Sequence, residues 1–388
     1  MTKSNRNTAM QPSLLVISPG GLGLHYHGPA ISLYRLLSTL KEHLSVDVIH
    51  GSAEQGDLAP LRGRAIRTGT ASPHLLRSIS FLLFASWYVL RNRRRYDTVV
   101  LATSSLLTLL PGALASQLGM RVISRAAAIS EVSTVSGGRF GAAVKRYLLG
   151  RSSAHLATSE AIARALRDSL GQKARIHLVP NGVDLARFAP VDPLSANKAA
   201  IELGLDPRSR FRIVCVGAIG DRKGQLHIVE ALAHLPKDVS LLLAGPIRQP
   251  AYFQQIGRVI EAADLEDRVS HIPFIAEVEK TYRAGDLFVL PSLGEGMPNA
   301  MLEAMASGLV PLGTQISGIE DLISDGCGRF VTRDSNSIAE AVRHYIDQPE
   351  ILAAESQRAR AVVEDTYGAE SISEKFYTLT CTQTDSEW

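Results

Sequence analysis

Two carboxylates, Glu295 and Glu303, frame a turn of small residues, with seven residues between them. Carboxylates accept hydrogen bonds from paired hydroxyl groups, which is the chemistry of sugar recognition. An earlier loop carries Arg222 and Lys223, and cations there could neutralise a diphosphate. The residue types alone leave a plainer alternative open. Glu295 could simply favour a helix N-terminus and Glu303 could be a solvated helix residue, while Arg222 and Lys223 could be exposed loop cations.

The elements around the two carboxylates predict a ligand site. Leu287–Leu290 is a short apolar run of the kind expected for a buried parallel strand. Residues 298–307 favour helix, with Pro298 near the first turn and Gly308 just past the end. Open α/β sheets bind ligands where strand ends feed helix starts, and free amides there suit a phosphate or sugar phosphate.

The rest of the chain alternates predicted strands and helices. Strands are expected near residues 13–18, 46–50, 97–102, 121–124, 211–216, 241–245 and 269–274. Such alternation predicts parallel sheets covered by helices. A glycine-rich loop at residues 19–29 precedes a predicted helix at 30–44 and could approach a phosphate closely. A merely flexible loop is the alternative.

Composition describes a globular protein large enough for two domains. The chain has 388 residues, of which 45% are hydrophobic and 20% charged. Its three cysteines are far apart and form no metal or disulfide pattern, which fits a reducing compartment. Residues 1–12 lack the apolar core of a signal peptide, and no apolar run approaches the length of a membrane span. We therefore expect a cytoplasmic protein, with the polar run 190–198 as interdomain linker.

Charge is distributed unevenly along the chain. Residues 1–190 hold 23 basic and 9 acidic residues (+14), whereas the remainder holds 18 and 29 (−11), in agreement with the total of +3. The basic half suggests an anionic partner. No nucleic-acid module is recognisable, so an anionic membrane is the better candidate. Residues 75–90 are apolar nearly all round and are followed by Arg91 and Arg93–Arg95. That pattern suits either a helix in an anionic interface or a helix buried on the sheet.

One stretch carries a family resemblance. Glu295-Gly296-Met297-Pro298, then residues 302–308 and Pro311, resemble the signature of the retaining glycosyltransferases of family 4. The resemblance implies an α/β protein of the GT-B fold, with two Rossmann-like domains whose parallel sheets face each other across a cleft. It also implies that the last helix returns to the first domain. We therefore expect domains at 1–190 and 191–364, with the helix at about 365–388 packed on the first.

The resemblance also implies roles for individual residues. Glu295 lies by the transferred sugar, orienting it without attacking it, and Glu303 holds the nucleotide ribose. Lys223 matches a Lys-Gly motif, whereas Ala218 stands where the family has an arginine, for which Arg222 is the substitute we assign. The donor-binding candidates are Gly28, Gly217, Phe274, Gly296, Met297, Pro298, Asn299, Ala300, Met301 and Glu303. The acceptor-side candidates are His25, His27 and Arg125.

The sequence thus predicts a hexosyltransferase-type enzyme (EC 2.4). We expect it to move a sugar from a UDP or GDP sugar to a glycan or lipid-linked acceptor with retention, in bacterial surface polysaccharide biosynthesis. No Asp-x-Asp pair occurs in the chain, so we expect no metal and no cofactor. We also expect peripheral membrane association and no nucleic-acid partner. Two alternatives stay open: a sugar-phosphate synthase on the same fold, or an inactive scaffold of polysaccharide assembly.

Overall fold

The structure is a computed structural model, which describes residues 11–20, 22, 28–51, 65–67, 74–132, 138–273, 277–323 and 326–382. The chain divides into two compact units. The first comprises Met1–Asn181 and Ile372–Trp388, and the second comprises Gly182–Ser371. The expected linker at 190–198 is wrong in part, because helix α7 (Pro193–Glu202) already begins there. Asp192 starts this helix by accepting hydrogen bonds from the amides of Leu194 and Ser195.

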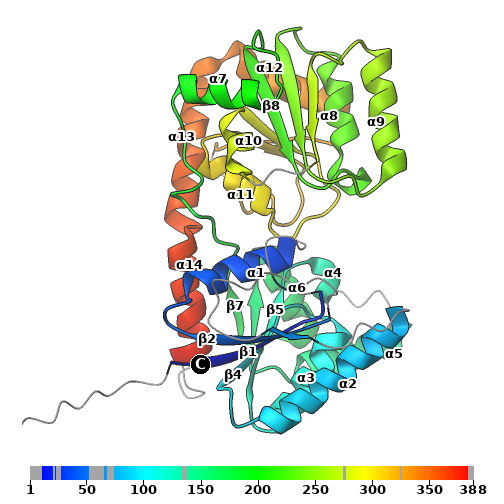
Figure 1. The fold of residues 1–388 in the computed structure, drawn as a ribbon, viewed down its shortest axis with the longest axis vertical. Helices are drawn as coiled ribbons and strands as arrows, with labels where there is room; N and C mark the ends of the chain where they lie inside the picture. The colour runs from blue at the N-terminus through cyan, green and yellow to red at the C-terminus, as the bar shows by residue number, and fades with distance from the viewer. Residues whose placement is uncertain are drawn as a thin grey trace, which may run out of the picture. The chain divides into compact units, whose positions relative to one another are not determined.

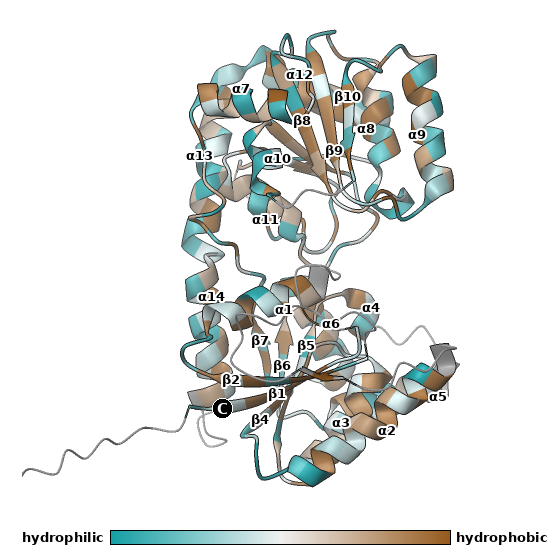
Figure 2. Ribbon diagram, in the orientation of Figure 1, coloured by the Kyte–Doolittle hydropathy of each residue, from teal (hydrophilic) through white to brown (hydrophobic). Residues whose placement is uncertain are grey.

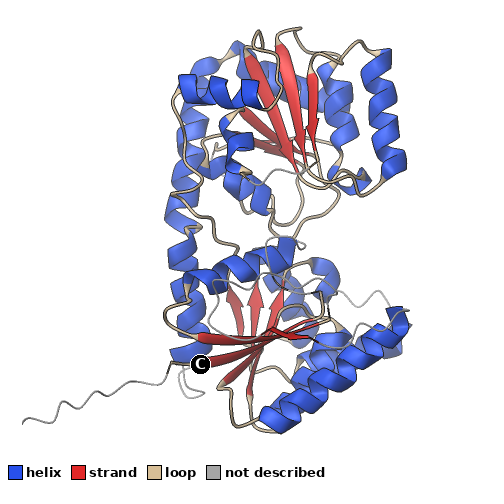
Figure 3. Cartoon of the chain, in the orientation of Figure 1, coloured by secondary structure: helices blue, strands red, loops and turns tan. Residues whose placement is uncertain are grey.

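The first unit contains a parallel sheet of seven strands in the order β3-β2-β1-β4-β5-β6-β7. The strands are β1 (Ser13–Ser18), β2 (Ser45–His50), β3 (Ala65–Arg67), β4 (Thr98–Leu101), β5 (Arg121–Ala126), β6 (Ala154–Ala157) and β7 (Ile176–Leu178). Strand order reverses between β1 and β4, as in doubly wound α/β folds (Figures 1 and 3). The short apolar runs that predicted strands are thus the buried strands of this sheet.

Each face of the first sheet is covered by a separate apolar cluster. Leu15 and Ile17 of β1 face one cluster and Leu14 and Val16 face the other, since side chains alternate along a strand. The first cluster is covered by α2 (His74–Asn92), α3 (Leu106–Gln117), α4 (Ile129–Val132), α5 (Gly138–Leu149) and α6 (Glu160–Leu170). The second is covered by α1 (Gly28–Thr39) and the C-terminal segment.

The C-terminal segment belongs to the first unit. It consists of the end of α14 (Ala369–Tyr377) and a short π-helical stretch, η2 (Thr378–Thr382). Ile372, Phe376 and Leu379 join the cluster beneath α1. The hydroxyl of Thr98 in β4 donates to the carbonyl oxygen of Thr380 at 3.0 Å. This described C-terminal segment is therefore part of the first core, and Figure 1 shows α14 beside the first sheet.

The second unit contains a parallel sheet of six strands in the order β10-β9-β8-β11-β12-β13. The strands are β8 (Phe211–Val216), β9 (Val239–Ala244), β10 (Val269–Ile272), β11 (Leu287–Leu290), β12 (Val310–Gly313) and β13 (Arg329–Phe330). Its helices are α7, α8 (Gln225–Leu232), α9 (Pro250–Ala262), α10 (Glu279–Arg283), α11 (Asn299–Ala306), α12 (Ser335–Asp347), α13 (Pro349–Thr366) and the short η1 (Asp221–Lys223). Order reverses between β8 and β11. The expected α/β class with parallel sheets is confirmed.

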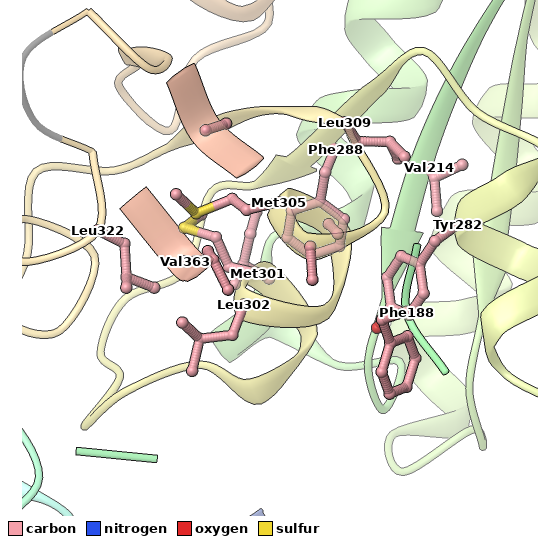
Figure 4. Packing of buried hydrophobic residues seen from close by; sticks show 14 of the residues in the cluster. Phe188, Val214, Tyr282, Phe288, Met301, Leu302, Met305, Leu309, Leu322 and Val363 are labelled. Carbon is pink, nitrogen blue, oxygen red and sulfur yellow. The ribbon is translucent and has the colours of Figure 1, made fainter. Parts of the chain in front are cut away.

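The predicted motif helix, α11, is anchored by its own apolar side chains. Met301, Leu302 and Met305 pack into a buried cluster with Tyr282 and Phe288 (Figure 4). Close packing of this kind fixes the helix against β11. The loop between β11 and α11 is therefore held at both ends by core contacts.

Candidate functional site

The candidate site lies at the carboxyl ends of β8 and β11, the neighbouring strands between which the order of the second sheet reverses. Ligands bind outside the strand ends at such a reversal point. The loop after β8 carries Arg222 and Lys223, and the loop after β11 carries Glu295. Parallel pairing of the two strands brings these loops to the same edge of the sheet.

A single carboxylate oxygen organises the two loops. The Oε1 atom of Glu295 accepts from Lys223 Nζ at 2.8 Å, from the hydroxyl of Ser292 at 2.8 Å and from Arg222 Nη1 at 3.0 Å. Among the described residues, every side-chain hydrogen bond to Glu295 ends on Oε1. Oε2 is therefore the atom with which Glu295 can accept from a ligand. The side chains of Lys223 and Glu295 are mostly buried, whereas that of Arg222 is more than half exposed.

The thiol of Cys215, which lies near this network, is unreactive near neutral pH. Cys215 lies in β8 and is fully buried. Burial raises the pKa of its thiol to about 12, with Lys223 opposing the shift and Glu295 adding to it. The thiol therefore stays protonated near neutral pH and is excluded as a nucleophile.

Two glycines hold the site loops against neighbouring backbone. Gly224 follows Lys223 with φ of +75°, and a Cβ there would lie 2.4 Å from the carbonyl oxygen of Pro291. Gly318 has φ of +80°, and a Cβ there would lie 2.0 Å from the carbonyl oxygen of Gly296. Only glycine combines the left-handed conformation with so close an approach. The loops that carry Lys223 and Glu295 are therefore positioned by backbone packing.

Glu303 is a buried acid, contrary to the solvated-residue alternative. It lies in α11 with only 5% of its surface exposed. Its Oε2 atom accepts from the hydroxyl of Tyr282 in α10 at 2.7 Å. Tyr282 is itself fully buried, so this hydrogen bond fixes the orientation of the Glu303 carboxylate from the core side.

The backbone between the two acids leads into a helix start. Gly296 and Met297 lie in the loop, Pro298 is the N-cap residue, and Asn299, Ala300 and Met301 form the first turn of α11. No side chain caps this helix. The amide of Met301 already donates to the carbonyl oxygen of Pro298 at 3.1 Å, so an anion at this end is received by amides that precede Met301.

The loop after β8 is shaped by a buried glutamine as well as by glycine. Gln225 donates to the carbonyl oxygen of Ala218 at 3.2 Å and accepts from the amide of Gly220 at 3.3 Å. The stem of Lys223 passes over Gly217, where a Cβ would lie 3.3 Å from the lysine Cε. Because Gly217 has no side chain, the space through which Lys223 reaches Glu295 stays open. Arg222 also donates to the carbonyl oxygen of Gly294 at 2.6 Å.

The remaining candidates lie in the first unit or outside the described residues. Arg125 is the penultimate residue of β5 and is only 2% exposed. Its guanidinium donates to Ser32 at 2.8 Å and Asn181 at 2.9 Å. Burial lowers the pKa of Arg125 to about 10, against the opposing charge of Glu131, so it stays charged near neutral pH. Gly28 is the first residue of α1. His25, His27 and Phe274 lie outside the described residues.

Sequence reasoning missed two contributors to the site, Ser292 and Tyr282. Ser292 donates to Glu295, Thr314 donates to the carbonyl oxygen of Ser292 at 2.6 Å, and Tyr282 donates to Glu303. Ser292 could have been found from its position three residues before Glu295, between strand and helix. Tyr282 gave no local signal because it reaches the site from another element, α10.

The comparisons with known proteins agree with this architecture. The family model described as "Glycosyl transferases group 1" matches residues 210–348, and the one described as "Glycosyltransferase Family 4" matches residues 26–187. LpsB of Rhizobium meliloti, a lipopolysaccharide core biosynthesis mannosyltransferase, is 29% identical over 239 residues, which cover 58% of this chain and 64% of LpsB. A UDP-Gal:alpha-D-GlcNAc-diphosphoundecaprenol alpha-1,3-galactosyltransferase of Escherichia coli is 30% identical over 182 residues, covering 45% of this chain and 46% of that enzyme. These alignments span about half to two thirds of the relatives' own length.

Solved structures show the fold over nearly the whole chain. HepE of Anabaena, determined in complex with UDP, has a TM-score of 0.80 at 20% identity, covering 95% of this chain and 99% of that one. WaaG, a glycosyltransferase involved in lipopolysaccharide biosynthesis, has a TM-score of 0.74 at 18% identity, covering 95% and 100%. The expected GT-B fold class is confirmed. With both family models matched, the chain belongs to the group 1, family 4 glycosyltransferases.

Proposed function

We propose that this protein transfers a sugar from a nucleotide-diphosphate sugar to a glycan or lipid-linked acceptor, with retention, in bacterial surface polysaccharide biosynthesis. The observation that carries the proposal is the convergence of Lys223 and Ser292 on one oxygen of Glu295 at the reversal point of the second sheet. LpsB and the galactosyltransferase, named above by their activities, support the acceptor class.

In this proposal the donor is held by the second unit. The start of α11 receives the diphosphate. Glu303 accepts hydrogen bonds from the ribose hydroxyls while the hydroxyl of Tyr282 donates to its Oε2 atom. Glu295 accepts from sugar hydroxyls through Oε2. Lys223 donates to the leaving diphosphate, whose charge grows in the transition state. Because Lys223 is already fixed by Glu295 at 2.8 Å, little reorganisation is needed when the donor binds.

We assign stabilisation of the leaving diphosphate to Lys223 and the helix amides, and not to a metal ion. The chain has no Asp-x-Asp pair, and the described residues contain no group of three or more His, Cys, Asp or Glu placed to hold a metal. Turnover unchanged by EDTA would agree with this assignment. The anomeric configuration of the product, read by NMR, tests retention.

The acceptor is assigned to the first unit, whose sequence is strongly basic. A lipid-linked acceptor carries anionic phosphates and resides in a membrane, so peripheral association with an anionic bilayer is part of the proposal. A second candidate function is a sugar-phosphate synthase. It is favoured by the alpha-maltose-1-phosphate synthase of Mycobacterium tuberculosis, which is 30% identical over 191 residues. A product assay that offers both a sugar phosphate and a lipid-linked saccharide separates the two functions.

The first test is a thermal-shift and calorimetric screen against UDP, GDP and their sugar conjugates. We expect one nucleotide series to raise the melting temperature, since a ligand that binds only the folded state stabilises it. Glu303→Gln keeps an acceptor for Tyr282 but removes the charge, and we expect it to lose most of the shift. Tyr282→Phe removes one of the hydrogen bonds that orient Glu303 and is expected to weaken binding several-fold.

The matched control is Tyr345→Phe. Tyr345 donates to the buried Glu355 at 2.5 Å in α13, so it removes the same kind of hydrogen bond at a place that takes no part in the proposal. It should lower stability by about 1 kcal/mol, as Tyr282→Phe does, and leave nucleotide affinity unchanged. If no nucleotide shifts the wild-type protein, the donor site assignment is wrong and the scaffold alternative gains. Full affinity in Glu303→Gln would remove Glu303 from the site.

A further inference from the structure

Helix α2 of the first unit has two apolar faces that point in opposite directions. Phe81, Ala85 and Val89 are buried against the sheet. The opposite face carries an apolar stripe that is exposed and regularly spaced. Its members are Leu76, Ile79, Leu83, Trp87 and Leu90. Their spacing of three and four residues places them on one side of the helix. Helix α2 is therefore buried on the sheet along one face and leaves the opposite face exposed.

The neighbouring helices extend this apolar exposure. Helix α3 contacts both α2 and α5, and all three cover the same face of the first sheet (Figures 1 and 2). Phe140 and Tyr147 of α5 are 83% and 64% exposed, and Leu106 and Leu110 of α3 are 48% and 40% exposed. Monomeric proteins rarely leave so many large apolar side chains in water on neighbouring elements.

The charges on these helices have one sign. No Asp or Glu occurs in α2, α3 or α5. Arg91, Arg93 and Arg94 follow the exposed stripe of α2 and are themselves exposed, and Lys145 and Arg146 lie on α5. Arg95 is held by Asp47 at 3.4 Å, which fixes the basic end relative to the sheet.

The stripe and the arginines meet in an open hollow. It has a volume of about 710 Å³ and is lined by Trp87, Leu90 and Arg91–Arg95. An apolar wall beside guanidinium groups matches a phospholipid, whose acyl chain and phosphate are joined in one molecule. Arginine is well suited to the phosphate because it can donate two parallel hydrogen bonds.

We propose that the outward faces of α2, α3 and α5 form a surface that docks on an anionic lipid bilayer, with the hollow at Trp87 and Arg91–Arg95 receiving an anionic phospholipid headgroup. Exposed apolar side chains enter the interface while the basic residues contact the headgroups. No described helix is long and apolar enough to cross a bilayer. The inference rests on the proposed function and deepens it, because a lipid-linked acceptor is met at a membrane surface.

The test uses the full chain and vesicles of phosphatidylcholine with or without phosphatidylglycerol. We expect co-sedimentation with the anionic vesicles only, and a decline as salt screens the charges. The chain has two tryptophans, so in a Trp388→Phe background Trp87 reports its own environment. Its emission should move to shorter wavelength when anionic vesicles are added.

Two double variants dissect the surface. Arg93→Gln with Arg94→Gln should lower the vesicle partition coefficient at least tenfold, and Leu83→Gln with Phe140→Gln should do the same. The matched controls are in the second unit and are also exposed. They are Arg258→Gln with Arg343→Gln, and Leu194→Gln with Ile201→Gln. All these side chains lie at the surface, so the variants fold, and the controls should bind vesicles as the wild type does.

Several outcomes would overturn the docking proposal. These are absence of vesicle binding, equal binding to neutral vesicles, or equal loss in the control variants. A doubled mass by light scattering that Leu83→Gln with Phe140→Gln abolishes, without vesicle binding, would assign the surface to a second copy of the chain. Vesicle binding needs no nucleotide and the nucleotide screen needs no lipid. Failure of the donor site would therefore leave vesicle binding intact, and the reverse also holds.

Discussion

The two units share a doubly wound parallel sheet, but they use glycine differently at their loops. In the second unit a Cβ at Gly224, Gly245, Gly318 or Gly328, all with positive φ, would lie within 2.4 Å of a backbone carbonyl oxygen. In the first unit Gly119 and Gly171 also have positive φ, yet a Cβ there would meet nothing within 4 Å. The four loops of the second unit that contain these glycines are thus packed backbone against backbone.

This difference separates two kinds of function on one topology. The second unit fixes a few polar groups, Lys223, Glu295 and Glu303, in tightly packed loops at a strand edge. The first unit instead presents wide helical faces with exposed apolar and basic residues, such as Trp87 and Arg93. Precise positioning suits a small donor, whereas a broad surface suits an extended partner.

The largest expected effect comes from Lys223→Ala. If the second unit stabilises the leaving diphosphate through Lys223, kcat should fall by about a hundredfold to a thousandfold, the usual cost of losing one such donor. Steady-state kinetics with the donor identified by the nucleotide screen would measure it. Lys237→Ala changes an exposed lysine of the same unit and should leave kcat unchanged. A similar loss in both variants would contradict the assignment.

The next effect tests the glycine comparison directly. Gly318→Ala should lower the free energy of unfolding by about 3 kcal/mol, from left-handed strain and from overpacking on Gly296. Gly119→Ala carries only the strain and should cost about 1 to 2 kcal/mol. Denaturant midpoints measure both variants, and nucleotide affinity should fall only in Gly318→Ala. Equal costs would show that backbone packing does not distinguish the units.

The smallest effect concerns acidification of the first unit. The buried histidines among the described residues, His50 and His155, are both in this unit. Burial, with a contribution from His177, lowers the pKa of His155 from 6.5 to about 4. The folded state therefore resists protonation, and stability present above pH 6.5 is lost as the pH falls toward 4. At about pH 5 the loss should be roughly 2 kcal/mol relative to neutral pH.

Unfolding midpoints at neutral and acid pH measure this loss. His155→Gln can still bond the hydroxyl of Ser124, which is 2.7 Å from the imidazole Nδ1, and should flatten the pH dependence. The exposed His234 of the second unit gives the matched variant His234→Gln, which should keep the wild-type profile. An unchanged profile in His155→Gln would remove this histidine as the cause.

The sheets were predictable because the strands have a recognisable local sequence pattern. Runs such as Leu14–Ile17 and Leu287–Leu290 are apolar throughout, as strands covered on both faces must be. The ligand edge was also predictable, since Glu295 and Glu303 flank a strand end and a helix start. The helix at Pro193 was mistaken for linker, because polar composition outweighed the cap signal of Asp192.

Contacts between distant elements could not be predicted. Tyr282 and Glu303 meet because α10 and α11 pack together, and neither sequence stretch signals the other. The burial of Arg125 likewise depends on Ser32 and Asn181, which other elements bring to the end of β5. The two faces of α2 were distinguishable only once Phe81, Ala85 and Val89 were seen against the sheet.

The C-terminal segment described above has a consequence for synthesis on the ribosome. The second unit is one continuous stretch, Gly182–Ser371, so it can complete its core as soon as that stretch has emerged. The first unit is translated earlier but lacks Ile372, Phe376 and Leu379 until the whole second unit has been translated. Since domains fold as units during translation, the unit that is translated first completes its core last. A chain that stops before Ile372 leaves this sheet face covered by α1 but not by the C-terminal segment.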